Sequence, residues 1–187
     1  SIISPSGKIR VKFTLSPTGE PTYSVSFNGK SIIGHSKLGM FTVEQSLVNG
    51  FKVTGSSNST KDETWKPLWG EVAQIRNHYN ELRATFVERD HDRRRFDVVF
   101  RVFDDGVGFR YAFPKQPAMD EVQIQEELTE FAIARPATAW WIPAFEWNRE
   151  EYLYSRTPIA SVGLAQTPMT IRTDGGVHVA FHEAALV

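Results

Sequence analysis

Hydrophobic and polar positions alternate with a period of two in several separate segments of the chain. These segments are residues 8–15, 22–27, 96–102, 107–113 and 177–183. Successive side chains of a β-strand point to opposite faces of the sheet, so the alternation predicts strands that each bury one face. The side chains predicted on the core face include Val98, Phe100, Phe109 and Tyr111.

Turn residues separate these predicted strands. Asn28-Gly29 is typical of a type I′ hairpin turn, in which both central residues have positive φ. Asp105-Gly106 and Asp174-Gly175-Gly176 predict two further hairpins. Strands at this spacing favour an all-β sandwich or barrel, and a chain of this length would hold on the order of 15 of them. We therefore expect an all-β fold with two large, stacked antiparallel sheets and few helices.

Two segments depart from the alternating pattern. Residues 119–133 carry the best helical period, but Val122 and Ile124 also fit a strand, and the strand is favoured. Residues 54–63, with the sequence TGSSNSTKDE, are polar and low in complexity, which predicts a surface loop. There is no internal repeat and no clear boundary, so residues 1–187 are expected to form a single domain.

Composition and charge narrow the classes of function. The chain has 187 residues with 21 Lys and Arg against 22 Asp and Glu, a net charge of −1, which gives no electrostatic case for a nucleic acid or an anionic membrane as partner. No segment approaches the roughly 18 apolar residues of a membrane-spanning helix. The chain has no cysteine, which excludes disulfides and thiolate metal sites. The closing residues, AALV, are apolar with no turn or polar tail after them, so we expect a longer polypeptide.

Histidine and serine patterns give no catalytic site. His178 and His182 share a strand face but would lie about 13 Å apart, so one metal ion cannot bind both. The segment HEAAL begins like the zinc-protease pattern H-E-x-x-H, but Leu186 occupies the position of the second histidine. No serine lies in a recognisable nucleophile motif.

Five tryptophans gather in two short segments, and their positions next to prolines predict loops or strand ends. They are Trp65, Trp69, Trp140, Trp141 and Trp147. Such rings can stack on the C–H face of a sugar. The alternative is that they close the ends of the sandwich core, and for any single ring this alternative is favoured.

One acidic residue lies on the apolar side of the last predicted strand. Val177, Val179, Phe181 and Glu183 share a face by their spacing. Burying a lone charge costs several kcal/mol, so a carboxylate on this face needs a partner.

Six segments, taken together, carry a family resemblance. They are DETWKPLWGEVAQIRNHYNEL, FRVFDDGVGFRYAFP, ELTEFAI, TAWWIP, EYLYSRTPI and HEAALV. With them the chain resembles, over roughly residues 5–187, the N-terminal domain of glycoside hydrolase family 97. The resemblance implies a galactose-mutarotase-like β-super-sandwich, with a catalytic (β/α)8 barrel after residue 187. It also implies α-glucosidase or α-galactosidase activity for the whole protein, calcium in its active site, and a periplasmic or secreted location.

The same resemblance assigns roles to individual residues. Glu183 corresponds to a glutamate that the N-terminal domain contributes to the calcium ion, while His182 is not expected to be a ligand because calcium prefers oxygen. The catalytic carboxylates lie on the barrel, so residues 1–187 alone are expected to be inactive. Residues expected to face the barrel or the oligosaccharide substrate are Trp65, Lys66, Trp140 and Trp141. An ion pair between Glu183 and an arginine of this domain is the alternative for that residue.

Three hypotheses follow for the whole chain. The first is a non-catalytic domain of a calcium-dependent, exo-acting α-glycoside hydrolase, which packs on its own barrel. The second is an autonomous carbohydrate-binding sandwich that uses the tryptophans. The third is a module that only stabilises its barrel.

Overall fold

The computed structural model describes residues 1–187 except 44–45, 91–93, 118, 120, 146–151 and 184–187. In this part of the chain it contains fifteen β-strands and one 3-10 helix of three residues. Every strand pairing is antiparallel, and the all-β class is confirmed. No helix within the described residues is long and apolar enough to cross a membrane. The chain divides into two compact units, residues 1–132 and 133–187, each described below by itself. The single-domain organisation of residues 1–187 stays a prediction.

The first sheet of unit 1 follows the chain in order. Its strands are β1 (Ile2–Ile3), β2 (Ile9–Leu15), β3 (Pro21–Phe27) and β4 (Lys30–Lys37). Asn28 and Gly29 join β3 to β4 with φ values of 48° and 76°, which confirms the predicted hairpin turn. Along β2, buried Ile9 and Val11 alternate with exposed Arg10 and Lys12, as the period of two predicts.

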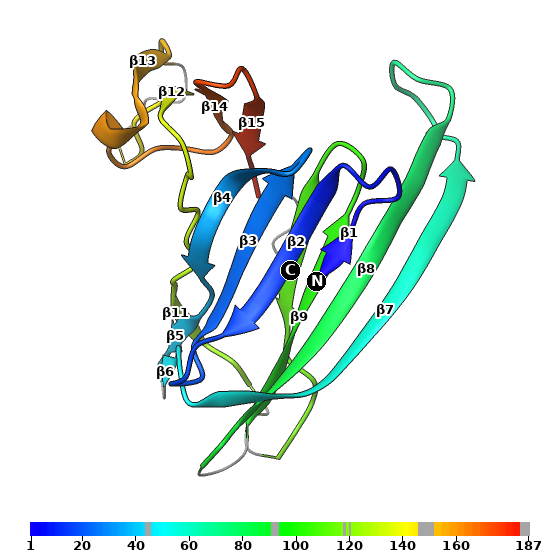
Figure 1. Cartoon of the computed structure of the whole chain (residues 1–187), viewed down its shortest axis with the longest axis vertical. Helices are drawn as coiled ribbons and strands as arrows, with labels where there is room; N and C mark the ends of the chain where they lie inside the picture. Colours follow the sequence, from blue (N-terminus) through cyan, green and yellow to red (C-terminus); the bar gives the residue numbers. More distant parts are fainter. Residues whose placement is uncertain (44–45, 91–93, 118, 120, 146–151, 184–187) are drawn as a thin grey trace. The chain divides into compact units, whose positions relative to one another are not determined.

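The second sheet of unit 1 has the order β10-β9-β8-β7 (Figure 1). Its strands are β7 (Phe51–Trp65), β8 (Ile75–Glu88), β9 (Arg95–Val102) and β10 (Val107–Ala112). The loop predicted for residues 54–63 is wrong, because this segment lies inside β7 and pairs with β8 along its length. As the edge strand, β7 is exposed from Lys52 to Trp65, so it carries polar side chains without an apolar face.

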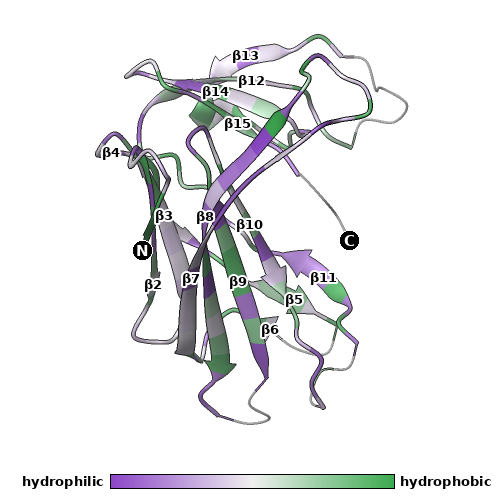
Figure 2. Ribbon diagram, turned by 90° about the vertical axis from the view of Figure 1, so that its right-hand side faces the viewer, coloured by the Kyte–Doolittle hydropathy of each residue, from purple (hydrophilic) through white to green (hydrophobic). Residues whose placement is uncertain are grey.

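These two sheets pack face to face through aromatic side chains. The ring centroid of Phe13 lies 5.1 Å from that of Phe86, and Tyr23 lies 5.4 Å from Phe109 and 6.0 Å from Phe100. Figure 2 shows hydrophobic positions alternating with hydrophilic ones along β8 and β9. Val98 and Phe100 are fully buried, and Phe109 and Tyr111 contact core rings, so the predicted core face is confirmed.

A third, small sheet completes unit 1. It consists of β5 (Met40–Thr42), β6 (Ser46–Leu47) and β11 (Ile124–Glu127) in the order β11-β5-β6. β11 confirms the strand favoured within residues 119–133. After it, the backbone amide of Glu130 donates to the carbonyl of Lys37 at 3.0 Å, so the chain continues along the edge of β4.

Unit 2 contains one sheet with the order β13-β12-β14-β15. Its elements are β12 (Ala137–Trp141), β13 (Ser155–Pro158), the 3-10 helix η1 (Ile159–Ser161), β14 (Met169–Thr173) and β15 (His178–Phe181). β14 and β15 form the hairpin predicted around Asp174-Gly175-Gly176. Within the described residues the strands are thus distributed over four sheets, where two larger ones were expected.

Candidate functional site

Glu183 follows β15, the last strand of unit 2. In this strand half-buried Val179 and Phe181 alternate with exposed His178 and Ala180, which confirms the predicted alternation. The side chain of Glu183 is exposed, so the expectation of an acid on the buried face is wrong. The reason is that the pairing of β15 with β14 ends at Phe181, and the chain leaves the packed sheet before Glu183.

The surroundings of Glu183 leave its carboxylate available. None of the ion pairs among the described residues involves it, so the alternative pairing with an arginine is not found in that part of the chain. No group of three His, Asp or Glu side chains within the described residues could hold a metal ion. The end of the HEAAL segment, which includes Leu186, lies outside the described residues. Glu183 can thus act as one oxygen ligand and needs further ligands from elsewhere.

Trp140 and Trp141 end β12 and are half-buried. The indole Nε1 of Trp141 donates to Oγ1 of Thr157 at 3.0 Å, and the guanidinium carbon of Arg156 lies 5.6 Å from the Trp140 ring centroid. Trp140 and Arg156 are directly opposite each other in the β12–β13 pairing. The predicted strand-end position is confirmed, and both rings contact side chains of β13, which the sequence did not reveal. Trp147 lies outside the described residues.

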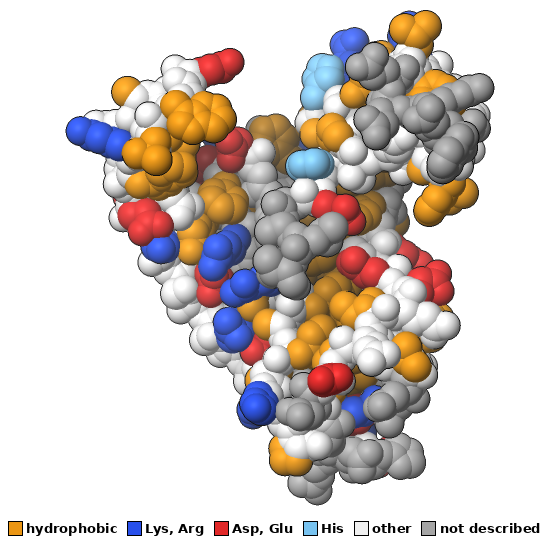
Figure 3. All heavy atoms as spheres, turned by 180° about the vertical axis from the view of Figure 1, so that it is seen from behind, with side chains coloured by type: hydrophobic (Ala, Val, Ile, Leu, Met, Phe, Trp, Pro, Cys, Tyr) orange, Lys and Arg blue, Asp and Glu red, His pale blue; other side chains and the backbone are white. Residues whose placement is uncertain are grey.

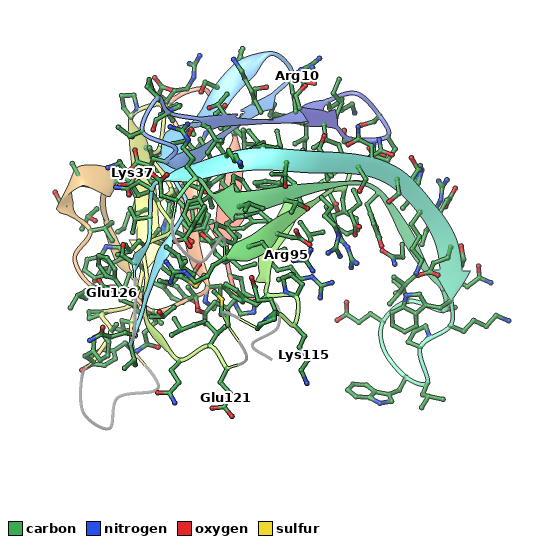
Figure 4. All side chains as sticks on the ribbon, turned by 90° about the horizontal axis from the view of Figure 1, so that it is seen from below. Arg10, Lys37, Arg95, Lys115, Glu121 and Glu126 are labelled. Atoms are coloured by element: carbon green, nitrogen blue, oxygen red, sulfur yellow. The ribbon has the colours of Figure 1, made fainter. Side chains whose placement is uncertain are left out.

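Trp65 and Lys66 belong to unit 1, at the connection between β7 and β8. Trp65 is the last residue of β7, opposite Ile75, and both Trp65 and Lys66 are exposed. Leu68, Trp69 and Val72 in the same connection are also exposed. Figure 4 shows side chains projecting from this end of the hairpin. Sequence reasoning noted the tryptophans but missed Leu68 and Val72, although two aliphatic residues in a turn segment were a signal.

Charged pairs flank this connection on the two strands. Nε and Nη2 of Arg76 donate to the two carboxylate oxygens of Asp62 at 2.8 and 2.7 Å, and these hydrogen bonds hold the pKa of Asp62 below its ordinary value. Hydrogen bonds from Lys61 and then Asn77 lower the pKa of Glu63 in the same way. These carboxylates stay ionised and are occupied by their partners, so they organise the hairpin and are poor candidates for proton transfer.

The arrangement places the sequence-predicted residues in two groups. Trp140 and Trp141 belong to β12 in the sheet of unit 2, and Glu183 follows β15 of the same sheet, in which β14 separates β12 from β15. Trp65 and Lys66 belong to unit 1. These groups offer one exposed carboxylate, which has no ion pair among the described residues, and four side chains that are exposed or half-buried, Trp65, Lys66, Trp140 and Trp141.

Comparison with known proteins gives the chain its family. A glycoside hydrolase family 97 enzyme from Pseudoalteromonas sp. strain K8, solved in complex with acarbose, is 40% identical with a TM-score of 0.94 over 100% of this chain and 28% of that chain. A probable retaining alpha-galactosidase from Streptomyces bingchenggensis is 31% identical over 144 residues, which are 77% of this chain and 21% of that protein. A retaining alpha-galactosidase from Bacteroides thetaiotaomicron is 28% identical over 113 residues, 59% of this chain and 16% of that protein.

The chain therefore spans about a fifth of the length of the curated relatives that it matches. Residues 2–187 match the family described as Glycosyl-hydrolase 97 N-terminal. The resemblance found in the sequence is confirmed, and this chain belongs to the glycosyl-hydrolase 97 N-terminal family.

Proposed function

We propose that residues 1–187 form the non-catalytic N-terminal domain of a calcium-dependent, exo-acting α-glycoside hydrolase, an α-glucosidase or an α-galactosidase. The observation that carries the proposal is the family match over residues 2–187, in a chain that covers only 28% of a solved family 97 enzyme. In this proposal the rest of the polypeptide includes a catalytic (β/α)8 barrel. The domain packs on that barrel next to the bound oligosaccharide, and the enzyme is periplasmic or secreted.

Glu183 contributes one carboxylate ligand to the calcium ion in this proposal. Calcium binds six to eight oxygen atoms at roughly 2.3–2.6 Å, so the barrel supplies the other ligands. Glu183 fits this role because its side chain is exposed and forms no ion pair among the described residues. His182 is exposed as well, but a hard cation prefers oxygen to imidazole nitrogen. With Glu183 as one ligand, a calcium ion held there would supply polarisation and orientation of substrate oxygen atoms.

The test is Glu183→Gln in the full-length enzyme, which keeps the shape of the side chain and removes its charge. The dissociation constant for calcium should rise at least about tenfold, as for other losses around a metal site, and activity at limiting calcium should fall. Glu126→Gln is the matched control, because Glu126 is an exposed glutamate of β11. An unchanged calcium dependence in Glu183→Gln would end the proposal for this residue.

The exposed Trp65 and Trp69 favour a second candidate, a carbohydrate-binding module that acts without the barrel. Titration of the isolated chain with acarbose or a maltooligosaccharide, followed by tryptophan fluorescence, separates the two. Saturable binding that is lost in Trp69→Ala supports the module. Absence of binding, together with calcium-dependent activity of the full-length enzyme, supports the first proposal.

A further inference from the structure

The β7–β8 hairpin extends past the sheet that contains it. β9 pairs with β8 from Asn80 to Val87, whereas β7 pairs with β8 as far as Trp65 and Ile75. Residues 61–79 therefore form a two-stranded ribbon with its connection, which we call the arm (Figure 1). Apart from Tyr79 at its root, no residue of the arm is buried, so core packing does not explain its length.

Backbone pairing and side-chain contacts join the two strands of the arm. A two-stranded ribbon is only marginally stable by itself in water. The bidentate pair of Arg76 with Asp62 and the hydrogen bond from Asn77 to Glu63 join the two strands of the arm. At its root, Tyr79 is buried with its ring centroid 5.1 Å from that of Phe103. The arm is therefore preformed, which lowers the entropy lost when it binds a partner.

The exposed large apolar side chains of the arm are confined to its end, residues 65–72, which we call the tip. Their exposed fractions are 49% for Trp65, 101% for Leu68, 88% for Trp69 and 55% for Val72. Figure 3 shows hydrophobic side chains gathered at the end of the arm, at upper left. Behind the tip, residues 54–64 are polar apart from one glycine. Monomeric proteins rarely expose such a cluster unless it is an interaction site.

The chemistry of the tip favours a protein surface over a sugar. A sugar site combines an aromatic platform with polar groups that bind the hydroxyls. Leu68 and Val72 cannot hydrogen-bond through their side chains, and Leu68 is the most exposed of the four. Aliphatic side chains gain most from burial against other apolar groups.

The size of the tip favours a partner within the same polypeptide. A stable interface between separate proteins uses roughly 20–30 residues on each side. The tip offers only four exposed large apolar side chains, far fewer than such an interface needs. A covalently linked partner is present at an effective concentration in the millimolar range, so a small contact suffices. The relatives are long enough to provide one, because the chain covers 21% and 16% of the two alpha-galactosidases.

We propose that the arm is a preformed docking element whose tip packs Leu68 and Trp69 against the catalytic part of the same polypeptide. The inference rests on the proposed function for the existence of that part. It adds the surface and the anchoring residues through which the two parts meet.

Thiol labelling of the full-length protein tests the docking. This chain has no cysteine, so Leu68→Cys introduces the only thiol in this region. Glu71→Cys is a second probe that keeps all four apolar side chains of the tip. Ser31→Cys is the control, a nearly isosteric change at an exposed residue of β4. Maleimide labelling is followed by peptide mass spectrometry in native protein and in urea, and each native rate is divided by its rate in urea.

Docking should slow labelling of Leu68→Cys and Glu71→Cys by about tenfold or more relative to Ser31→Cys, since the thiol then reacts only after local undocking. If Leu68→Cys weakens the contact, Glu71→Cys alone remains slow, which also supports the proposal. Protection should persist over about a hundredfold dilution, because an intramolecular contact does not depend on concentration. Equal rates at all three positions overturn the proposal. Protection lost on dilution identifies a second copy, and protection that requires an added oligosaccharide identifies a sugar; either result also overturns it.

The outcome is independent of the calcium test. Slow labelling at the tip with unchanged calcium dependence in Glu183→Gln would retain the docking and reject the calcium ligand. Fast labelling at the tip with weakened calcium binding would do the opposite.

Discussion

A buried ion pair joins the end of β8 to the start of β9 and leads to a quantitative prediction. The side chains of Glu88 and Arg94 are only 11% and 10% exposed. Nε of Arg94 donates to Oε2 of Glu88 at 2.8 Å, Nη2 donates to Oε1, and the backbone amide of Arg94 donates to Oε2 at 3.2 Å. Arg94→Met removes the guanidinium, and within the described residues the carboxylate of Glu88 keeps the hydrogen bond from the backbone amide of Arg94.

Removing one partner of a buried pair costs about 3–5 kcal/mol, mostly because the remaining charge is buried without compensation. The residual exposure of Glu88 allows some hydration, so we expect about 3 kcal/mol for Arg94→Met. Replacing both residues with apolar ones of similar size removes the desolvation cost together with the attraction. Glu88→Leu/Arg94→Met should therefore be about as stable as the original chain, within roughly 1 kcal/mol, or more stable.

Urea unfolding of the purified 187-residue chain, followed by circular dichroism, measures these free energies. Lys37→Met is the control, since Lys37 and Glu20 form an ion pair that is 53% and 22% exposed and should contribute less than about 1 kcal/mol. The reasoning is refuted if Arg94→Met costs no more than Lys37→Met. It is refuted equally if the double variant is no more stable than Arg94→Met.

Three further predictions concern backbone packing, alkaline pH and activity. Gly19 and Gly7 both have φ of +78°, but a Cβ on Gly19 would lie 2.4 Å from the carbonyl oxygen of Phe51, whereas nothing lies within 4 Å of a Cβ on Gly7. Gly19→Ala should therefore lower the free energy of unfolding in urea by at least about 1 kcal/mol more than Gly7→Ala. Equal losses in the two variants would contradict the clash. Burial raises the pKa of Tyr111 to about 12 and raises that of Tyr23 as well, so their contribution to stability is complete below pH 10 and is lost as the pH rises toward 12. The tyrosinate absorbance should show Tyr23 and Tyr111 ionising only together with unfolding. Ionisation of both rings near pH 10 in folded protein would contradict this. The purified chain should not hydrolyse p-nitrophenyl α-glucoside or α-galactoside, because glycoside hydrolysis needs two placed carboxylates and the proposed pair lies on the barrel; turnover above a buffer blank would refute this.

The strands that the sequence predicted correctly are those in which the signal is local. In residues 8–15 one face is buried and the other carries exposed Arg10 and Lys12, so selection for packing leaves a period of two in the sequence. In residues 96–102 both faces are largely buried, and the period comes from polar Asp97 and Arg101 between apolar residues. The turn at Asn28-Gly29 is also local, because only a few residue types accept positive φ at both positions. These two signals were sufficient for the fold class.

β7 shows where such reasoning ends. Eleven polar or small residues in a row, from Thr54 to Thr64, gave no period, because an edge strand beyond the core has no face to bury. Its structure comes from the long pairing with β8, a partner about 20 residues away on average, and from cross-strand pairs such as Thr60 with Asn80. Composition alone therefore predicted a loop where the chain forms its longest strand.

Periodicity and composition singled out Glu183 and the tryptophans, but the calcium role proposed for Glu183 came only from the family resemblance. Residue identities named Glu183 and the tryptophans, but exposure depends on where each strand stops. The same limit applies to Leu68, which is as apolar as any core residue in sequence and fully exposed in the structure.

The exposure of Glu183 changes how its role can be tested. A buried acid would need a partner for folding, and replacing it would disturb stability and function together. Because Glu183 is exposed and lies past the end of β15, its charge is not required for the packing of unit 2. Glu183→Gln should therefore leave the thermal unfolding of residues 1–187 within about 0.5 kcal/mol of the original chain. Any loss of calcium affinity in the full-length enzyme then reports on the ligand itself, and a large loss of stability in the isolated chain would contradict this separation.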